Sequence, residues 1–417
     1  MPDSHVRRRL LALATAAMCV VALLPGQSAV AAPADPAALP LSQRALPESC
    51  APRLAEASRK AAGKGGTGTC VEMGKLSRAT APAAAASGGS GTTAVTCGNS
   101  AWAMARFGAC ATAPVTLYVY IVPSGALVGI IDMTVTFMAD LGSIDGRPRY
   151  NVTVRATALA GQVLGTLITH EGYCEYGCNG FTGGSAYRFD YVGAQANFIL
   201  NAAPGATAPG AVHTAQMMLY FWFVNAAWSP PVSNAVGASS PQFRCDNAVP
   251  GLNQPGCVYP SIRPVYTPSP ANNSYRQHIQ MALDHNLPRT LTRTTDSFDH
   301  TQNHNRACPG MHRPPDGYSC DEYPFQSTLQ GAFTGGHTYG RTFSGCQVGW
   351  LDVRQRGDNG GWNVCYIPAF ENSSGGNELN RFYVNNRVID RDSFARPVRN
   401  GWRPCCRGYG RAACWSA

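Results

Sequence analysis

Short apolar segments of β type recur through the middle of the chain. They are rich in β-branched and aromatic residues, as in VTLYVYIV at residues 115–122, and residues 150–156 alternate strictly between apolar and polar positions. The segments cover residues 115–122, 130–138, 150–156, 189–200 and 217–224. Gly, Pro and Asn turn signals separate them. Short strands at this spacing predict an antiparallel β module over residues 97–249, either sandwich-like or a barrel.

The hydrophobic period becomes helical after a Pro-rich connector at residues 250–270. Residues 275–285 place Ile279 and Leu283 on one helical face, and Pro288 ends the segment. The sequence therefore predicts a helix at the start of a C-terminal domain over residues 271–400.

A polar stretch follows this helix. Residues 291–293 predict a short strand, and residues 296–305 predict a polar loop. Four histidines lie in this part of the chain: His278, His285, His300 and His304. None has the spacing of a complete metal-ligand set, so solvated or capping roles are favoured for them.

Two further elements complete the predicted C-terminal domain. Residues 360–368 alternate and end in a proline, which predicts a strand. Residues 371–385 predict a helix, because Leu379, Phe382 and Tyr383 share one face. The whole chain is therefore expected to be α+β: an all-β module followed by a small α+β domain.

The N-terminus has the pattern of an export signal. Three arginines at residues 7–9 precede an apolar run at residues 10–24, and AVA at residues 29–31 suits signal peptidase. We predict a signal peptide over residues 1–31, with both the general and the twin-arginine export routes open. Residues 32–96 are rich in Ala, Gly, Ser and Pro and are interpreted as a linker or pro-region, with a short helix within residues 41–62.

Cysteine usage agrees with export. The chain has 16 cysteines, of which Cys19 lies in the signal peptide. In an exported chain they predict disulfides between sequence neighbours. The expected pairs are Cys50 with Cys70, Cys97 with Cys110, Cys174 with Cys178, Cys245 with Cys257, Cys308 with Cys320, and Cys346 with Cys365. A Cys-rich tail at residues 401–417 holds three more cysteines, one of which has no partner. A zinc site is disfavoured, because no second CxxC-like pair is present.

The charge is basic and consists mainly of arginine. The formal net charge is +9, and from residue 254 onward 17 Arg face 12 Asp plus Glu. Arginine suits bidentate contacts with phosphate, so the balance favours an anionic partner such as nucleic acid. A codon bias toward Arg explains the choice of Arg over Lys equally well.

Two acidic stretches carry the candidate chemistry. Asp321 and Glu322 lie among aromatic residues and next to Cys320, and Glu371 and Asn372 begin the last predicted helix. These residues could together hydrolyse phosphodiesters. One carboxylate would act as the base, another carboxylate and an amide oxygen would bind Mg²⁺ or Mn²⁺, and nearby arginines would bind the phosphates. Structural capping and ion pairing by these acids is an equally open interpretation.

These motifs resemble those of the NucA/NucB family of secreted deoxyribonucleases. CDEYPFQST at residues 320–328 resembles the family's Asp-Glu-(Tyr/Trp)-Pro signature, and PAFENSSGG at residues 368–376 resembles its Glu-Asn-x-x-x-Gly segment. DHNLP at residues 284–288, followed by residues 291–293, is similar to the segment upstream of the signature. The resemblance covers about residues 275–393 and leaves out the β module.

The resemblance implies a small ββα-metal endonuclease with little sequence preference. It assigns the general base to Asp321 and the metal to Glu371, with Glu322 and Asn372 in support. Successive strand residues face opposite sides, so only one of the two adjacent acids is expected to face the phosphate, and we favour Asp321. Contacts with nucleic acid are expected from three further residues, Arg289, Arg293 and His285.

The substrate is expected to be DNA, with RNA open, and no membrane contact is expected after signal cleavage. A wall, matrix or intramolecular partner is open for the β module. Its His170-Glu171 pair lacks the second His of an HExxH motif, so a salt bridge at a strand end or a solvated pair is expected there. Two other functions remain to be weighed. The chain could be an extracellular binding protein that holds nucleic acid without cleaving it, or Asp321 and Glu371 could hydrolyse a glycoside.

Overall fold

The computed structural model describes six stretches of the chain, which are residues 41–61, 65–78, 95–142, 146–183, 185–353 and 360–396. The predicted signal peptide and the Cys-rich tail lie outside them. All of these described residues fall within one compact unit. No helix within the described stretches is both long and apolar enough to cross a membrane.

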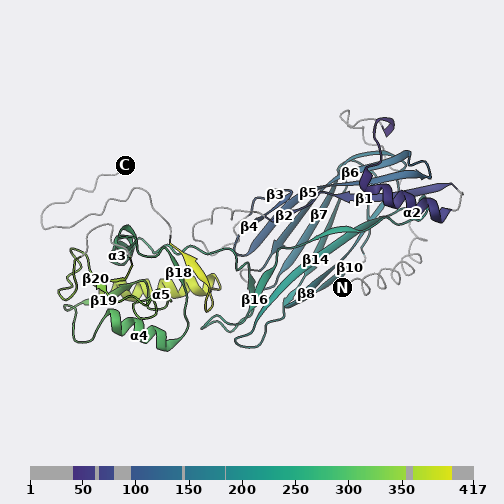
Figure 1. Ribbon diagram of the computed structural model, residues 1–417. Coiled ribbons are helices and arrows are strands. Elements are labelled where there is room, and N and C mark those ends of the chain that lie inside the picture. Colours follow the sequence, from purple (N-terminus) through teal and green to yellow (C-terminus); the bar gives the residue numbers. More distant parts are fainter. Residues whose placement is uncertain are drawn as a thin grey trace. The chain divides into compact units, whose positions relative to one another are not determined.

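The β module contains a first sheet with the order β12-β7-β6-β5-β4-β2, in which β1 and β3 also pair with β5 (Figure 1). Long antiparallel pairings of β5 with β6 and of β6 with β7 form its centre. Its described strands are β1 (Gly66–Met73), β2 (Ser77–Arg78), β3 (Gly98–Asn99), β4 (Ala101–Met104), β5 (Gly108–Val122), β6 (Leu127–Asp140), β7 (Arg149–Gly161) and β12 (Gln195–Asn201).

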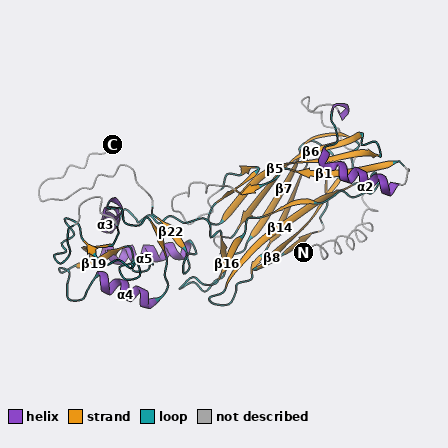
Figure 2. Ribbon diagram, in the orientation of Figure 1, coloured by secondary structure: helices purple, strands orange, loops and turns teal. Residues whose placement is uncertain are grey.

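A second sheet has the order β10-β8-β14-β16-β17, with β11 on β8 and β15 on β14. Its described strands are β8 (Leu167–Tyr176), β10 (Phe181–Gly183), β11 (Tyr187–Arg188), β14 (Val212–Val224), β15 (Val236–Ser239), β16 (Phe243–Asp246) and β17 (Gly256–Val258). A separate pair joins β9 (Cys178–Asn179) to β13 (Ala203–Pro204). Together the strands curl into a β half-barrel (Figure 2).

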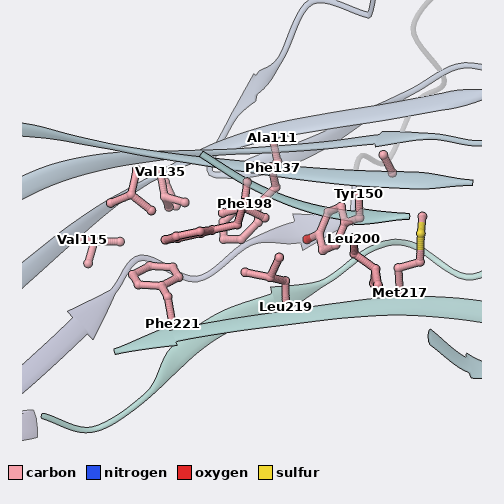
Figure 3. Packing of buried hydrophobic residues seen from close by; sticks show 14 of the residues in the cluster. Ala111, Val115, Val135, Phe137, Tyr150, Phe198, Leu200, Met217, Leu219 and Phe221 are labelled. Carbon is pink, nitrogen blue, oxygen red and sulfur yellow. The ribbon is translucent and has the colours of Figure 1, made fainter. Parts of the chain in front are cut away.

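The inner faces of the two sheets share one apolar core. Alternate residues of β6, including Val135 and Phe137, are fully buried, and they meet Leu219 and Phe221 of β14 (Figure 3). This period-2 burial is what the alternating sequence predicts. The β-rich character predicted for this region is therefore confirmed, although the sheets form a half-barrel.

Two details of the β module differ from the sequence-based expectation. Strand β1 lies in the stretch interpreted as a linker, yet it pairs along its whole length with β5. His170 and Glu171 lie in the middle of β8, not at a strand end, and the buried imidazole of His170 stacks on Phe198 at 4.1 Å between ring centroids. Before β1, the short helices are η2 (Leu41–Gln43), η3 (Glu48–Cys50) and α2 (Ala51–Ala61).

The C-terminal domain is a small α+β structure with its own core. A three-stranded sheet has the order β19-β21-β20, in which β19 and β21 are antiparallel and α5 follows β21 directly. Its helices are α3 (Asn273–Asp284), α4 (Ser297–Ala307) and α5 (Ala369–Asn385). Its strands are β18 (Thr290–Thr292), β19 (Tyr318–Tyr323), β20 (Gly340–Arg341), β21 (Trp362–Pro368) and β22 (Ser393–Ala395).

Helix α4 corrects the prediction of a polar loop at residues 296–305. Asp296 caps the helix by accepting a hydrogen bond from the backbone N–H of Phe298. Asn303 fixes the helix against the following segment, donating to the carbonyl oxygens of Gln326 and Thr328. The buried, hydrogen-bonded side chain of Asn303 therefore anchors α4, which lacks the apolar stripe by which hydrophobic periodicity detects a helix.

All six predicted disulfide pairs are present. Their partners lie between 4 and 20 residues apart in sequence. The bond between Cys50 and Cys70 joins η3 to β1, and the bond between Cys308 and Cys320 joins the end of α4 to β19.

A buried network of three arginines and two aspartates links residues of the β module to the end of α5. Arg106 and Arg244 donate to opposite oxygens of Asp392, at 3.1 and 2.6 Å. Arg387 donates to Asp246 at 2.7 Å, and Arg244 reaches the other oxygen of Asp246 at 3.0 Å. Cations at the C-terminal end of a helix also complement its dipole.

Candidate active site

Strand β19 presents its two adjacent carboxylates to different helices. Asp321 contacts His278 of α3, whereas Glu322 contacts His304 of α4. Alternate strand residues point to opposite faces, so the two acids belong to separate environments. The two acids therefore lie in different surroundings, as alternation along a strand predicts.

The pair of His278 and Asp321 is almost completely buried. The Nδ1 atom of His278 lies 2.5 Å from Oδ2 of Asp321, and the side chains are 0% and 8% exposed. An ionised carboxylate can only accept, so Nδ1 donates its proton and holds the carboxylate in one orientation. The other ring nitrogen, Nε2, is buried without a hydrogen-bond partner among the described residues.

Glu371 also contacts α3, at Ser274. Its carboxylate accepts hydrogen bonds from the backbone N–H of Ser274 at 2.5 Å and from the hydroxyl of Ser274 at 3.3 Å. Ser274 and His278 are one helical turn apart, which places them on one face of α3. Asp321 and Glu371 are therefore both held against α3, at positions one helical turn apart.

Asn372 joins the start of α5 to β19. Its Nδ2 group donates to the carbonyl oxygen of Cys320 and to the hydroxyl of Ser319, both at 3.0 Å. The bond to Cys320 acts immediately before Asp321, so the amide fixes the spacing between the two acidic stretches. Of the predicted site residues, Asp321, Glu371 and Asn372 thus lie where α3, β19 and α5 contact one another.

Glu322 lies on the opposite face of β19. Its side chain is 9% exposed and lies 3.7 Å from Nδ1 of His304, whose side chain is 45% exposed. Burial raises the pKa of Glu322, and the interaction with Glu322 raises the pKa of His304. The structure does not bring Glu322 to the face of β19 on which Asp321 contacts α3.

The three predicted nucleic-acid contacts lie in different surroundings. Arg293 is 5% exposed, donates to the carbonyl oxygen of Val388 and covers the ring of Tyr383. Arg289 is half-buried and donates to the last turn of α3, and His285 interacts with the carbonyl oxygen of Met281. These contacts leave the guanidinium of Arg293 little surface for a phosphate.

Sequence reasoning missed two residues of the site. The sequence favours a solvated or capping role for His278. Its apolar neighbours on α3, Tyr275 and Ile279, indicate burial instead. Ser274 carries no chemical signal of its own. Each is recognised only through its partner, since Asp321 is 43 residues beyond His278 and Glu371 is 97 residues beyond Ser274.

Comparison with curated proteins and with solved structures gave no match. The scan against family models matched the C-terminal part of the chain, which includes α4, β19, β21, α5 and the second half of α3. The matched segment holds both Asp321 and Glu371. Residues 279–395 thus match the model of the deoxyribonuclease NucA/NucB family, the family that the motifs at residues 320–328 and 368–376 had indicated.

Proposed function

We propose that the chain is a secreted, metal-dependent endonuclease that hydrolyses phosphodiester bonds of DNA with little sequence preference. The observation that carries this proposal is that Asp321 and Glu371, both within the segment that matches the deoxyribonuclease family, contact successive turns of α3. The order of β19, β21 and α5 supports a ββα-metal core.

The residues at this site fit a hard divalent cation. Glu371 offers carboxylate oxygens, and Asn372 uses its Nδ2 group on β19, which leaves Oδ1 as the atom that it can offer. Oxygen donors of this kind, few in number, suit Mg²⁺ or Mn²⁺. Such an ion, when bound, would act as a Lewis acid on the phosphoryl oxygens.

The protein's own residues supply the proton transfer. Asp321 accepts the proton of the attacking water, and the N–H of His278 keeps the accepting oxygen in place. His278 is therefore a positioning residue, because it acts through Asp321. Burial of this pair excludes bulk water and strengthens the interaction.

Six disulfides suit an oxidising compartment outside the cell, which agrees with secretion. An anionic substrate agrees with the excess of arginine over acids beyond residue 254. The β module would then bind a wall or matrix component or the nuclease domain itself.

The test is cleavage of plasmid DNA by the full chain with Mg²⁺ or Mn²⁺, with and without a chelator. We expect cleavage that the chelator abolishes, and a loss of about a hundredfold or more in Asp321→Asn and Glu371→Gln. Glu378→Gln, on the same helix α5, is the matched control, since Glu378 only accepts from the backbone of Ser269. Intact plasmid under every metal would refute the enzyme proposal.

The alternative is a protein that binds nucleic acid without cleaving it. It is favoured by the engagement of both acids, because Asp321 is occupied by His278 and Glu371 by Ser274. The same assay separates the two functions, since retarded but uncut DNA would support binding alone. Cleavage that survives both acid substitutions would contradict the assigned site while leaving the activity in place.

A further inference from the structure

A second group of potential metal ligands lies on the opposite face of β19 from Asp321. It consists of His304, Cys308 and Glu322, whose ligand atoms all lie within 4.8 Å of one another. His304 and Cys308 are one helical turn apart at the end of α4, and Glu322 projects toward them from β19. Nothing in the proposed nuclease mechanism uses this group.

The distances within the group match a tetrahedral site. The Oε2 atom of Glu322 lies 3.7 Å from Nδ1 of His304 and 3.6 Å from Sγ of Cys308. Two ligands on a tetrahedral Zn²⁺, with bonds of about 2.0–2.3 Å, are separated by about 3.4–3.6 Å. The ligand atoms of His304 and Cys308 lie within 4.8 Å of each other, so movement of these two side chains would complete the tetrahedral geometry.

The disulfide controls whether this group can bind an ion. Cys308 is bonded to Cys320, and only a thiolate is an effective zinc ligand. We propose that His304, Cys308 and Glu322 bind one Zn²⁺ when the bond between Cys308 and Cys320 is reduced, and that disulfide formation abolishes this site.

Reduction of the disulfide and binding of zinc are two separate steps. A dithiol reductant supplies two electrons and two protons to the Cys308–Cys320 bond and becomes a disulfide itself. The thiol of Cys308 then loses its proton as the sulfur binds zinc. Oxidation by a disulfide donor reverses the process and releases the ion.

The ligand set defines the class of metal. One sulfur, one imidazole nitrogen and one carboxylate oxygen favour Zn²⁺, Co²⁺ or Cd²⁺, whereas the oxygen donors at Glu371 favour Mg²⁺. The half-exposed side chain of His304 leaves a fourth position open to water. The ion would join α4 to β19 in the thiol state, as the disulfide does in the oxidised state.

The experiment uses the full chain with Cys320→Ser, which frees the thiol of Cys308 and leaves the other five disulfides intact. Co²⁺ is added first, because a thiolate-to-cobalt charge-transfer band reports ligation by sulfur, and Zn²⁺ is then used to displace it. We expect one equivalent of metal in this variant and none in the matched Cys308→Ser/Cys320→Ser control. Adding His304→Ala or Glu322→Gln to Cys320→Ser should weaken binding by about tenfold or more.

Equal metal binding by the Cys320→Ser protein and its double-serine control would overturn the proposal. If Cys320→Ser fails to fold by near-ultraviolet circular dichroism, the wild-type chain and the double-serine control are both reduced and titrated with Zn²⁺. One extra equivalent in the wild type supports the site, and no difference refutes it. These readouts need no DNA, so they are independent of the nuclease proposal.

Discussion

Replacing His278 with leucine keeps the size of the buried side chain but removes the N–H that holds Asp321. A hydrogen bond to a charged group is worth about 1.5–3 kcal/mol. At about 1.4 kcal/mol for each factor of ten, its loss should lower kcat about 10- to 150-fold. The burial of both side chains and the 2.5 Å separation of Nδ1 from Oδ2 place this bond at the upper end of the range.

Three variants separate positioning from packing. His278→Asn restores an N–H close to the position of Nδ1 and should recover part of kcat, although it leaves a larger cavity than leucine does. Gln280→Ala, which removes a hydrogen bond from Gln280 to Asp284 on the same helix, is the control for α3 itself. Steady-state cleavage of a fluorogenic duplex gives kcat and KM separately, and KM should change little.

Two results would refute this reasoning. One is full kcat in a folded His278→Leu protein, which would mean that Asp321 needs no orienting partner. The other is a loss in His278→Asn as large as that in His278→Leu, with both matching the loss of folded protein, which would reduce His278 to a packing residue.

Three further outcomes follow from the polar contacts. Because contact with Glu322 raises the pKa of His304, proton binding at His304 stabilises the fold below about pH 6.5, and this contribution is lost as the pH rises through the pKa of His304 in the folded protein. NMR titration of the imidazole should show a lower pKa in Glu322→Gln, and an unchanged titration would contradict the pairing. Asn303→Ala should destabilise the protein by about 2 kcal/mol, since two backbone N–H groups lose their acceptor, and an unchanged urea midpoint would argue against that network. Arg387→Met should cost about 3 kcal/mol by the same measurement, because Asp246, which is fully buried, loses one of its cations, and a neutral effect would show that the remaining arginine suffices.

The sequence predicted those parts of the fold that have a local signal. The β-branched and aromatic run at residues 115–122 lies in β5, and the alternating segment at residues 150–156 lies in β7. The last helix is predicted within two residues of its observed start at Ala369. The disulfides were predictable because each joins cysteines close in sequence, where closing the loop costs little entropy.

Other parts have no such local signal. Helix α4 is almost wholly polar, and its evidence lay in the cap at Asp296 and the basic residues of the last turn, not in hydrophobic period. Strand β1 is rich in Gly and Thr and owes its conformation to its long pairing with β5. Tertiary pairing of this kind overrides a weak local preference.

The site was predictable in its acids but not in their partners. Asp321 and Glu371 were identified by residue type and motif, whereas His278 and Ser274 acquire their roles only when α3 packs against β19 and α5. A histidine on an amphipathic helix carries no mark of the carboxylate that it will meet.

The cap formed by Glu371 has a consequence for how occupancy of the site could be observed. The carboxylate that would hold a cation also closes the first turn of α3, through the amide of Ser274. An ion that draws this carboxylate away leaves that amide free to exchange its hydrogen with solvent. Amide hydrogen exchange at the start of α3 would therefore quicken on loading with Mg²⁺, in the absence of any DNA.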